Sequence, residues 1–334
     1  MATSLAEIRA KLQAQENRSQ GGSSQGGDNA IYAHWNIPEG TSAKIRFLPD
    51  ANAKNDFFWV ERLMIKLPFA GVKGQSDSKP VIVQVPCVEM YGEACPILAE
   101  VRTWFKDPGL EEMGRKYWKK KSYLFQGFVK ENPLSDDKTP DNPIRRFVIS
   151  PQIFNLIKAA LMDPELESMP TDYTAGLDFT VSKTQKGGYA DYSTSKWSRK
   201  ETAITAQEQA AIDTHGLHNL ADFLPKKPGD VELRVLKEMF EASVDGQAYD
   251  PDRWSQYYKP SGFQSKGGDE NTGGTSTAKS TPAAAPAPAP APTLAPFDTD
   301  EDDAPVATAT AAVTAKPSSQ KAEDILAMIR NRSK

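Results

Sequence analysis

The chain has only two cysteines, Cys87 and Cys95, in 334 residues. Two cysteines are too few for a disulfide framework, and their scarcity is typical of a reducing compartment. The sequence contains no run of about 18 apolar residues, so it predicts no membrane-spanning helix. The first residues lack a signal-peptide pattern, because charged residues separate the apolar ones. We therefore expect a soluble, cytoplasmic protein without a membrane partner.

Histidine is also scarce, and recognisable catalytic motifs are missing. The three histidines, His34, His215 and His218, show no spacing that relates them to each other or to the cysteines as metal ligands. The sequence has no Gly-x-x-x-x-Gly-Lys loop to bind phosphates. Carboxylates do not cluster within the expected strands of the core, which argues against a nuclease. We expect a protein that is not an enzyme.

Composition divides the chain into four parts. Residues 30–258 mix apolar and charged side chains and contain all six tryptophans, so this stretch is long enough for a substantial core. Residues 259–316 are rich first in Gly and Ser, then in Ala and Pro, and then in acidic residues, which predicts a disordered linker. The two remaining parts are the ends of the chain, residues 1–29 and 317–334, and each is expected to contain a short amphipathic helix.

Two segments combine cations with aromatic rings, although the whole chain carries a net charge of -4. The first segment, residues 115–125, has five cations and no anion between Arg115 and Lys121, with four rings among or just after them. The second, residues 183–200, has five cations against one anion, together with Tyr189, Tyr192 and Trp197. Cations neutralise phosphates and rings stack on bases without reading their sequence. The pattern predicts binding of a single-stranded nucleic acid.

Two other interpretations stay open. Rings and lysines also alternate in half-buried strands, with the rings facing inward and the lysines outward. In that case the protein is an interaction scaffold, with a folded core and a C-terminal peptide hook. A single-stranded RNA-binding protein is the other alternative, because stacking and phosphate contacts distinguish the two sugars poorly.

Strand patterns dominate the first part of the core and helix patterns the later part. Strands are predicted at residues 43–47, 57–67, 81–85, 122–130, 144–149 and 177–183, with Gly127 as a bend and Gly187-Gly188 as a turn. Ser150 and Thr205 predict the starts of helices that run to about 162 and 214, and a further helix is expected at 231–242. The predicted class is α+β, with an OB-fold-like, partly open β-barrel core and added helices.

Several stretches resemble the helix-destabilising single-stranded DNA-binding proteins of T-even-type tailed phages. They are Ile45-Arg46-Phe47-Leu48-Pro49, Lys119-Lys120-Lys121-Ser122-Tyr123, Arg145-Arg146-Phe147, and Gly188 to Tyr192 continuing through Lys196-Trp197. The resemblance covers residues 45 to 200 in the family's order. It implies an OB-fold with an electropositive cleft, and a protein that coats single-stranded DNA cooperatively during replication, recombination and repair. For a phage protein, the location implied is the host cytoplasm.

The residue patterns and the resemblance together predict one set of DNA-binding side chains. The resemblance implies that seven of them line or flank the cleft: Arg46, Lys120, Lys121, Tyr123, Phe147, Tyr189 and Tyr192. The other members come from the two basic-aromatic segments and from the pair of arginines before Phe147. They are Arg115, Lys116, Tyr117, Lys119, Arg145, Arg146, Lys183, Lys186 and Trp197.

The chain departs from the family at its metal site. The family holds a structural zinc with one His and three Cys. Here Cys87 and Cys95 match two of these positions, Leu98 stands at the last one, and no His lies between His34 and His215. Two thiolates are too few for a closed tetrahedral zinc site. We therefore expect no zinc or other cofactor, and an apolar cluster of Ile97, Leu98 and Val101 in its place.

The terminal segments are expected to bind proteins. The N-terminal helix lacks the family's cluster of basic residues but presents an apolar face for contacts between protomers on DNA, through Leu5, Ile8, Arg9, Lys11 and Leu12. The resemblance implies that the acidic distal region recruits replication and recombination proteins. The residues predicted for this role are Asp298, Asp300, Glu301, Asp302, Asp303, Ile325, Leu326 and Ile329.

Overall fold

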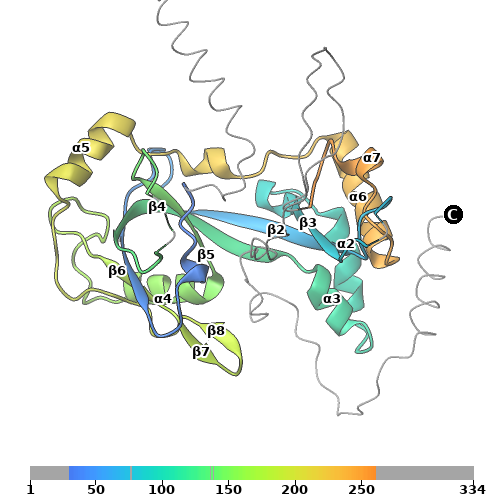
Figure 1. Cartoon of the computed structure of the whole chain (residues 1–334), viewed down its shortest axis with the longest axis horizontal. Helices are drawn as coiled ribbons and strands as arrows, with labels where there is room; N and C mark the ends of the chain where they lie inside the picture. The colour runs from blue at the N-terminus through green and yellow to red at the C-terminus, as the bar shows by residue number, and fades with distance from the viewer. Residues whose placement is uncertain (1–29, 76, 136, 138, 261–334) are drawn as a thin grey trace, which may run out of the picture. The chain divides into compact units, whose positions relative to one another are not determined.

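The computed structural model describes residues 30–260, except residues 76, 136 and 138 (Figure 1). The predicted terminal helices and the acidic run lie outside these residues. The described chain forms two compact units, whereas the sequence predicted one core. Unit 1 comprises residues 30–48, 126–148 and 168–217, and unit 2 comprises 49–125, 149–167 and 218–260. Both mix helices with antiparallel strands, which confirms the α+β class.

Unit 1 is built on antiparallel strand pairs. Strand β1 pairs with β6 and with the second half of β4, β6 pairs with β9, and β5 pairs with β4. Apolar residues of β1 alternate as predicted, and Ala43, Ile45 and Phe47 are fully buried. The bounds are Ser42–Phe47 (β1), Lys120–Glu131 (β4), Arg145–Ile149 (β5), Phe179–Ser182 (β6) and Lys196–Trp197 (β9). The unit also contains the short helix η1 (His34–Asn36) and α5 (Ala206–His215).

Gly127 permits the close pairing of β1 with β4. It lies opposite Phe47, and a Cβ atom built on it would fall 2.1 Å from the carbonyl oxygen of Arg46. No other residue fits there without moving a strand. The sequence predicted a bulge or a bend at this glycine, but the bulge-like irregularity in the pairing of β1 with β4 lies between Lys44 and Ile45.

A separate two-stranded hairpin completes unit 1. Strands β7 (Thr184–Lys186) and β8 (Tyr189–Asp191) are joined by Gly187 and Gly188, whose φ angles are 62° and 86°. Positive φ at both central residues is what a tight type I′ hairpin turn requires. The predicted turn is thus confirmed, and Figure 1 shows the hairpin extending beyond the other strands of the unit.

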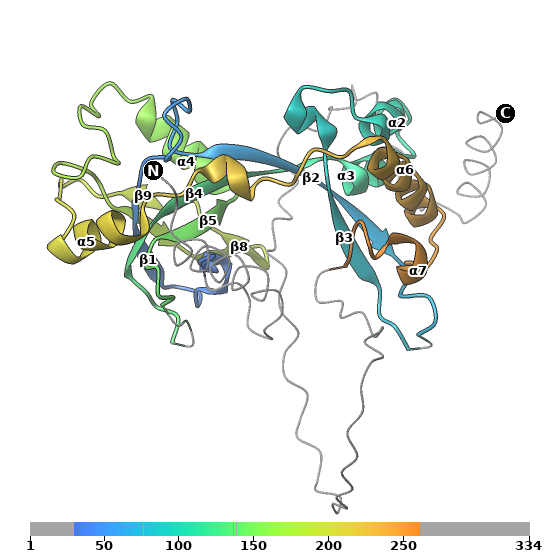
Figure 2. The ribbon, with the colours of Figure 1, turned by 90° about the horizontal axis from the view of Figure 1, so that it is seen from above.

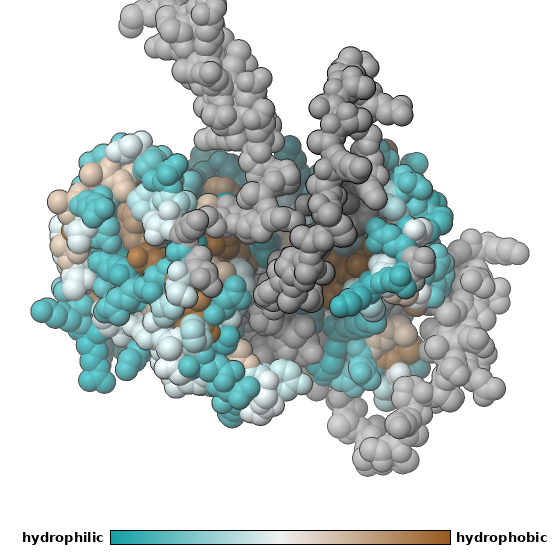
Figure 3. Space-filling model, in the orientation of Figure 1, coloured by the Kyte–Doolittle hydropathy of each residue, from teal (hydrophilic) through white to brown (hydrophobic). Residues whose placement is uncertain are grey.

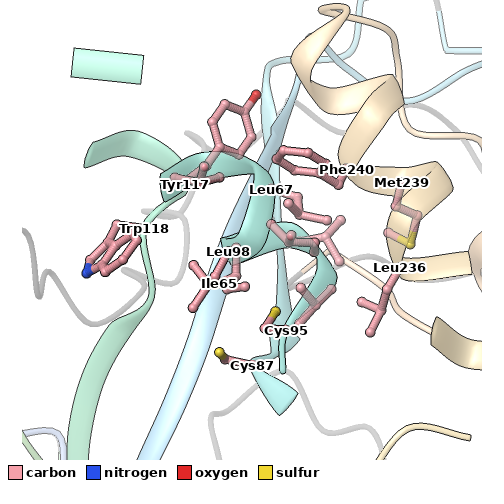
Figure 4. Packing of buried hydrophobic residues seen from close by; sticks show 14 of the residues in the cluster. Ile65, Leu67, Cys87, Cys95, Leu98, Tyr117, Trp118, Leu236, Met239 and Phe240 are labelled. Atoms are coloured by element: carbon pink, nitrogen blue, oxygen red, sulfur yellow. The ribbon is translucent and has the colours of Figure 1, made fainter. Parts of the chain in front are cut away.

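Unit 2 contains strands β2 and β3 and the first half of β4, all paired antiparallel. Figure 2 shows helices α2, α3 and α6 grouped beside β2 and β3, and their apolar side chains fill one core (Figure 4). The bounds are Val60–Phe69 (β2), Val81–Pro86 (β3), Val88–Tyr91 (η2), Pro96–Trp104 (α2), Glu111–Tyr117 (α3), Pro151–Leu161 (α4), Leu220–Phe223 (η3), Asp230–Val244 (α6) and Pro251–Trp254 (α7).

Local signals explain where several helices begin. The Ser150 hydroxyl accepts from the backbone N–H of Ile153 at the start of α4, and Pro151 occupies the first turn, as predicted. Thr205 and Glu208 form a reciprocal capping box at the start of α5. Helices α2 and α3 were not predicted. None of the described helices combines the length and the apolar character that crossing a membrane requires.

Candidate nucleic-acid interface

The rings of the first basic-aromatic segment lie in the core of unit 2. The segment consists of the last turn of α3 and the start of β4, and Tyr117, Trp118, Tyr123 and Phe125 are all buried. Tyr117 packs edge-on against Phe240 at 5.5 Å, and Tyr123 stacks on Phe154 at 3.5 Å with an interplanar angle of 11°. These rings are already occupied by protein neighbours. The half-buried-strand interpretation therefore describes the rings of this segment.

The cations of the same segment face outward, but carboxylates accompany them. Arg115 pairs with Glu111 at 2.7 Å, Lys119 with Glu89 at 2.9 Å, and Lys121 with Glu61 at 3.8 Å. Lys116 is exposed, and its Nζ lies 5.7 Å from the ring centre of Tyr117. Lys120 is half-buried. The row is still basic, but its field is weaker than the sequence alone suggests.

Glu89 illustrates this compensation. Burial disfavours its charge, but hydrogen bonds from Lys119 and Arg102 outweigh that effect and lower the pKa of the carboxyl. Glu89 is therefore ionised at neutral pH and holds two cations at once. A phosphate that binds Lys119 must compete with this carboxylate.

The second segment differs, because a ring reaches the surface of unit 1. Tyr189 begins strand β8 next to the hairpin turn and is 70 % exposed. It lies directly opposite Lys186 in the register of the hairpin, and Lys186 is also exposed. Three further cations of the segment, Lys196, Arg199 and Lys200, are exposed as well. Figure 3 shows the surface in the region of the hairpin as mainly hydrophilic to neutral.

Other members of the second segment anchor it. Tyr192 is buried and packs edge-on against His34 at 5.9 Å, while Trp197 is half-buried and packs against Phe179 at 5.0 Å. Desolvation raises the pKa of Tyr192 to about 12 and lowers the pKa of His34 to about 4, so both are neutral near pH 7. Lys183 donates to the carbonyl oxygen of Trp35 at 2.8 Å, which fixes the chain before the hairpin.

Arg46 was predicted to contact DNA but is fully buried in unit 1. Its Nε lies 2.7 Å from Asp178, and its guanidinium also donates to Thr202. Asp178 is shared with Lys130, whose Nζ is 3.5 Å away. We therefore correct the assignment: Arg46 supports the fold and does not present its charge to a ligand.

The same correction applies to two other predicted contacts. Arg145 is 2 % exposed, pairs with Asp137 at 2.9 Å, and lies over the ring of Tyr32 at 5.0 Å. Phe147 is fully buried and packs edge-on against Phe47 at 5.7 Å. Arg146, between them, is half-buried. Alternation along β5 places the two neighbours of Arg146 on the inner face.

One exposed ring was missed by sequence reasoning. Phe57 is 57 % exposed and belongs to the segment of unit 2 that precedes β2. The sequence pattern assigned it to the start of a strand, but that strand begins at Val60. Three consecutive aromatic residues, Phe57-Phe58-Trp59, were the available signal. Only Phe58 of these three is buried.

The two cysteines do not fit a zinc site. Both thiols are buried in the apolar cluster that also contains Ile97, Leu98 and Val101 (Figure 4). The hydrogen bond between them raises the pKa of Cys87 and lowers that of Cys95, whose sulfur also accepts from backbone N–H groups at the start of α2. The described residues contain no group of three or more His, Cys, Asp or Glu that could hold a metal. Zinc requires four ligands in such sites.

The exposed members of the predicted interface thus fall into two groups. Unit 2 contributes the exposed Lys116 with four half-buried cations between residues 115 and 121, whose adjoining rings are buried, and unit 1 contributes a cationic hairpin with an exposed ring. Comparison of the chain with models of known protein families and with curated protein sequences finds no match.

Proposed function

We propose that this protein binds single-stranded DNA without sequence preference. The observation that carries the proposal is the β7–β8 hairpin, where Tyr189 is 70 % exposed directly across from Lys186. An exposed tyrosine ring offers a flat face on which a base can stack. A tight type I′ turn holds the ring beside a cation. A nucleotide has two matching groups, because its base can stack on the ring and its phosphate can bind the cation.

The proposed contacts give affinity that does not depend on the nucleotide sequence. Stacking on Tyr189 uses the face of a base, which every base has, and lysines contact phosphates, which carry no sequence information. In a duplex, the base faces are already stacked on each other, so the tyrosine has no partner. Binding would therefore shift the equilibrium between duplex and single strand by mass action, which destabilises a helix without ATP.

The resemblance in sequence extends the proposal to the fold of unit 1, the biological role and the terminal segments. The antiparallel pairs β1–β4 and β1–β6 of unit 1 are compatible with a partly open OB barrel, which is the fold we propose for it. The proposed role is protection of single strands in replication, recombination and repair. It involves no catalysis and no metal, and it includes self-association and recruitment of partners through the terminal segments.

The interaction scaffold remains a second candidate, because the rings of residues 117–125 are buried as that interpretation requires. The two candidates differ in what the hairpin does. In a scaffold, Tyr189 contributes nothing to nucleic-acid binding.

The test is a titration of the full chain with a fluorescent single-stranded oligonucleotide at several salt concentrations, with duplex DNA and single-stranded RNA as competitors. We compare the wild type with Tyr189→Ala and with Tyr189→Phe, which keeps the ring. Loss of one stacked base predicts that Tyr189→Ala weakens binding by roughly 1–3 kcal/mol, whereas Tyr189→Phe binds normally. A wild type that binds no single strand, or prefers duplex, contradicts the proposal. Stronger competition by RNA would favour an RNA-binding protein.

A further inference from the structure

The segment before β2 holds an exposed ring in a fixed position. The side-chain amide of Asn55 donates to Asp50 at 2.7 Å and to the carbonyl oxygen of Trp59 at 3.1 Å, and its oxygen accepts from the backbone N–H of Phe57 at 3.1 Å. Asp50 in turn accepts from the backbone N–H of Leu220 at 3.0 Å. The segment is therefore tied both to itself and to the body of unit 2, and the ring of Phe57 is carried on an ordered turn.

A row of rings supports Phe57 from behind. Its ring centre lies 4.8 Å from that of Trp59 with an interplanar angle of 30°, and Trp59 stacks on Phe125 at 5.7 Å and 29°. Phe154 packs edge-on against Trp59 at 5.3 Å. Among the described residues, Trp59 is the only ring in contact with Phe57. One face of Phe57 is thus backed by a rigid indole, and the ring is 57 % exposed.

The size and charge of the surroundings narrow the choice of ligand. Lys54 and Asp56, which precede Phe57 in the chain, are both exposed, so this stretch has one exposed cation and one exposed anion and no excess of positive charge for phosphate. Phe57 is the exposed ring of this segment, whereas the apolar patches that mark protein–protein interfaces are usually larger. A flat ligand of the size of one ring matches Phe57. Nucleobases have this shape, and stacking on them requires no charge.

We infer that Phe57, backed by Trp59, is a base-stacking site of unit 2. The inference rests on the proposed binding of single-stranded DNA. It assigns to unit 2 a contact with bases, in addition to the contact of its lysines with phosphates. Asn55 is a positioning residue, because it holds the turn that presents the ring.

The experiment uses the full chain with Phe57→Leu, which keeps an apolar side chain but removes the flat face, and with Phe57→Trp, which keeps a flat face. Each variant is titrated with an oligothymidylate and with an abasic strand of equal phosphate number. We expect Phe57→Leu to bind the oligothymidylate on the order of tenfold more weakly. Its binding to the abasic strand and its salt dependence should be unchanged, and Phe57→Trp should bind like the wild type. Because the side chain is exposed, thermal unfolding should be the same in all three proteins.

Three outcomes overturn the inference, and they can be distinguished from one another. If the wild type binds and Tyr189→Ala weakens binding but Phe57→Leu does not, the site at Phe57 is wrong and the proposed function stands. If the wild type binds neither strand, the proposed function fails and the inference fails with it. A loss in Phe57→Leu that is equal for the base-containing and abasic strands also overturns it, because a stacking contact requires a base.

Discussion

Residues 115–125 and 183–200 have nearly the same composition, but the structure uses them differently. In the first segment every ring is buried and the cations lie beside carboxylates. In the second, the ring of Tyr189 is exposed and its cross-strand neighbour is a lysine. The difference comes from the strands: β4 pairs on both sides within the main sheet, whereas β7 and β8 form a sheet of their own.

This contrast shows what limits the interpretation of a basic-aromatic segment. Residues Ser122 to Phe128 of β4 are buried without interruption, so both faces of this strand are covered and alternation does not separate inside from outside. A two-stranded hairpin has no second layer to cover it. The same residue types therefore stabilise a core in one place and remain available to a ligand in the other.

The largest expected difference concerns stability. Tyr117→Ala should lower the free energy of unfolding by about 3–5 kcal/mol, because it empties a site packed against Phe240. Tyr189→Ala should change it by less than about 0.5 kcal/mol, because the ring is at the surface. Urea denaturation of both variants measures the two values. Similar losses in the two variants would remove the contrast between the segments.

The buried arginine offers a second comparison, between a cation inside unit 1 and one at its surface. Arg46→Met should cost about 3–5 kcal/mol, because it leaves the buried Asp178 without its closest partner. The control is Lys44→Met, which removes a solvent-exposed pair with Glu131 and should change stability little. A stable Arg46→Met protein with weakened DNA binding would instead restore Arg46 as a contact residue.

Acid should weaken the anchoring of the second segment. The pKa of His34 is about 4 in the folded protein because of desolvation, whereas an unfolded histidine titrates near 6.5. Between these values the unfolded state binds the additional proton, so stability is complete above pH ~6.5 and falls by up to about 1.4 kcal/mol per pH unit toward pH ~4. Urea denaturation at several pH values should show this dependence reduced in His34→Phe. The same slope in the variant would assign the acid sensitivity to carboxylates.

The smallest expected effect is on the salt dependence of DNA binding. Lys186→Gln should reduce the slope of log affinity against log salt by about 0.7, the value for one phosphate contact on a single strand. Lys119→Gln should reduce it less, because Glu89 already compensates the charge of Lys119. Equal changes in slope would show that the carboxylates near residues 115–121 do not screen their lysines.

Local structure could be predicted from the sequence wherever a short-range signal determines it. The caps at Ser150 and Thr205 and the Gly187-Gly188 turn are of this kind, since each depends on hydrogen bonds or φ angles within a few residues. Helices α2 and α3 escaped prediction. Neither has a side chain that caps its first turn, and Pro96 in the first turn of α2 was the one start signal available.

The burial of individual charges and rings could not be predicted, because it depends on distant partners. Arg46 follows the alternating pattern of an outward residue, but its partner Asp178 is 132 positions away in the chain. Tyr117 similarly depends on Phe240, which comes from α6. Tyr189 is exposed because a tight turn with few residues on either side offers little to cover a ring.

Gly127 has a consequence for recognising relatives of this chain. A methyl group at this position would collide with the backbone of the neighbouring strand at Arg46. Selection on the fold alone should therefore preserve the glycine, whatever residue stands at position 46, and should separately preserve Arg46 together with Asp178, its buried ion-pair partner. These three residues can persist after overall similarity has been lost. They give evolutionary searches a signature that is independent of any surface residue that contacts a ligand.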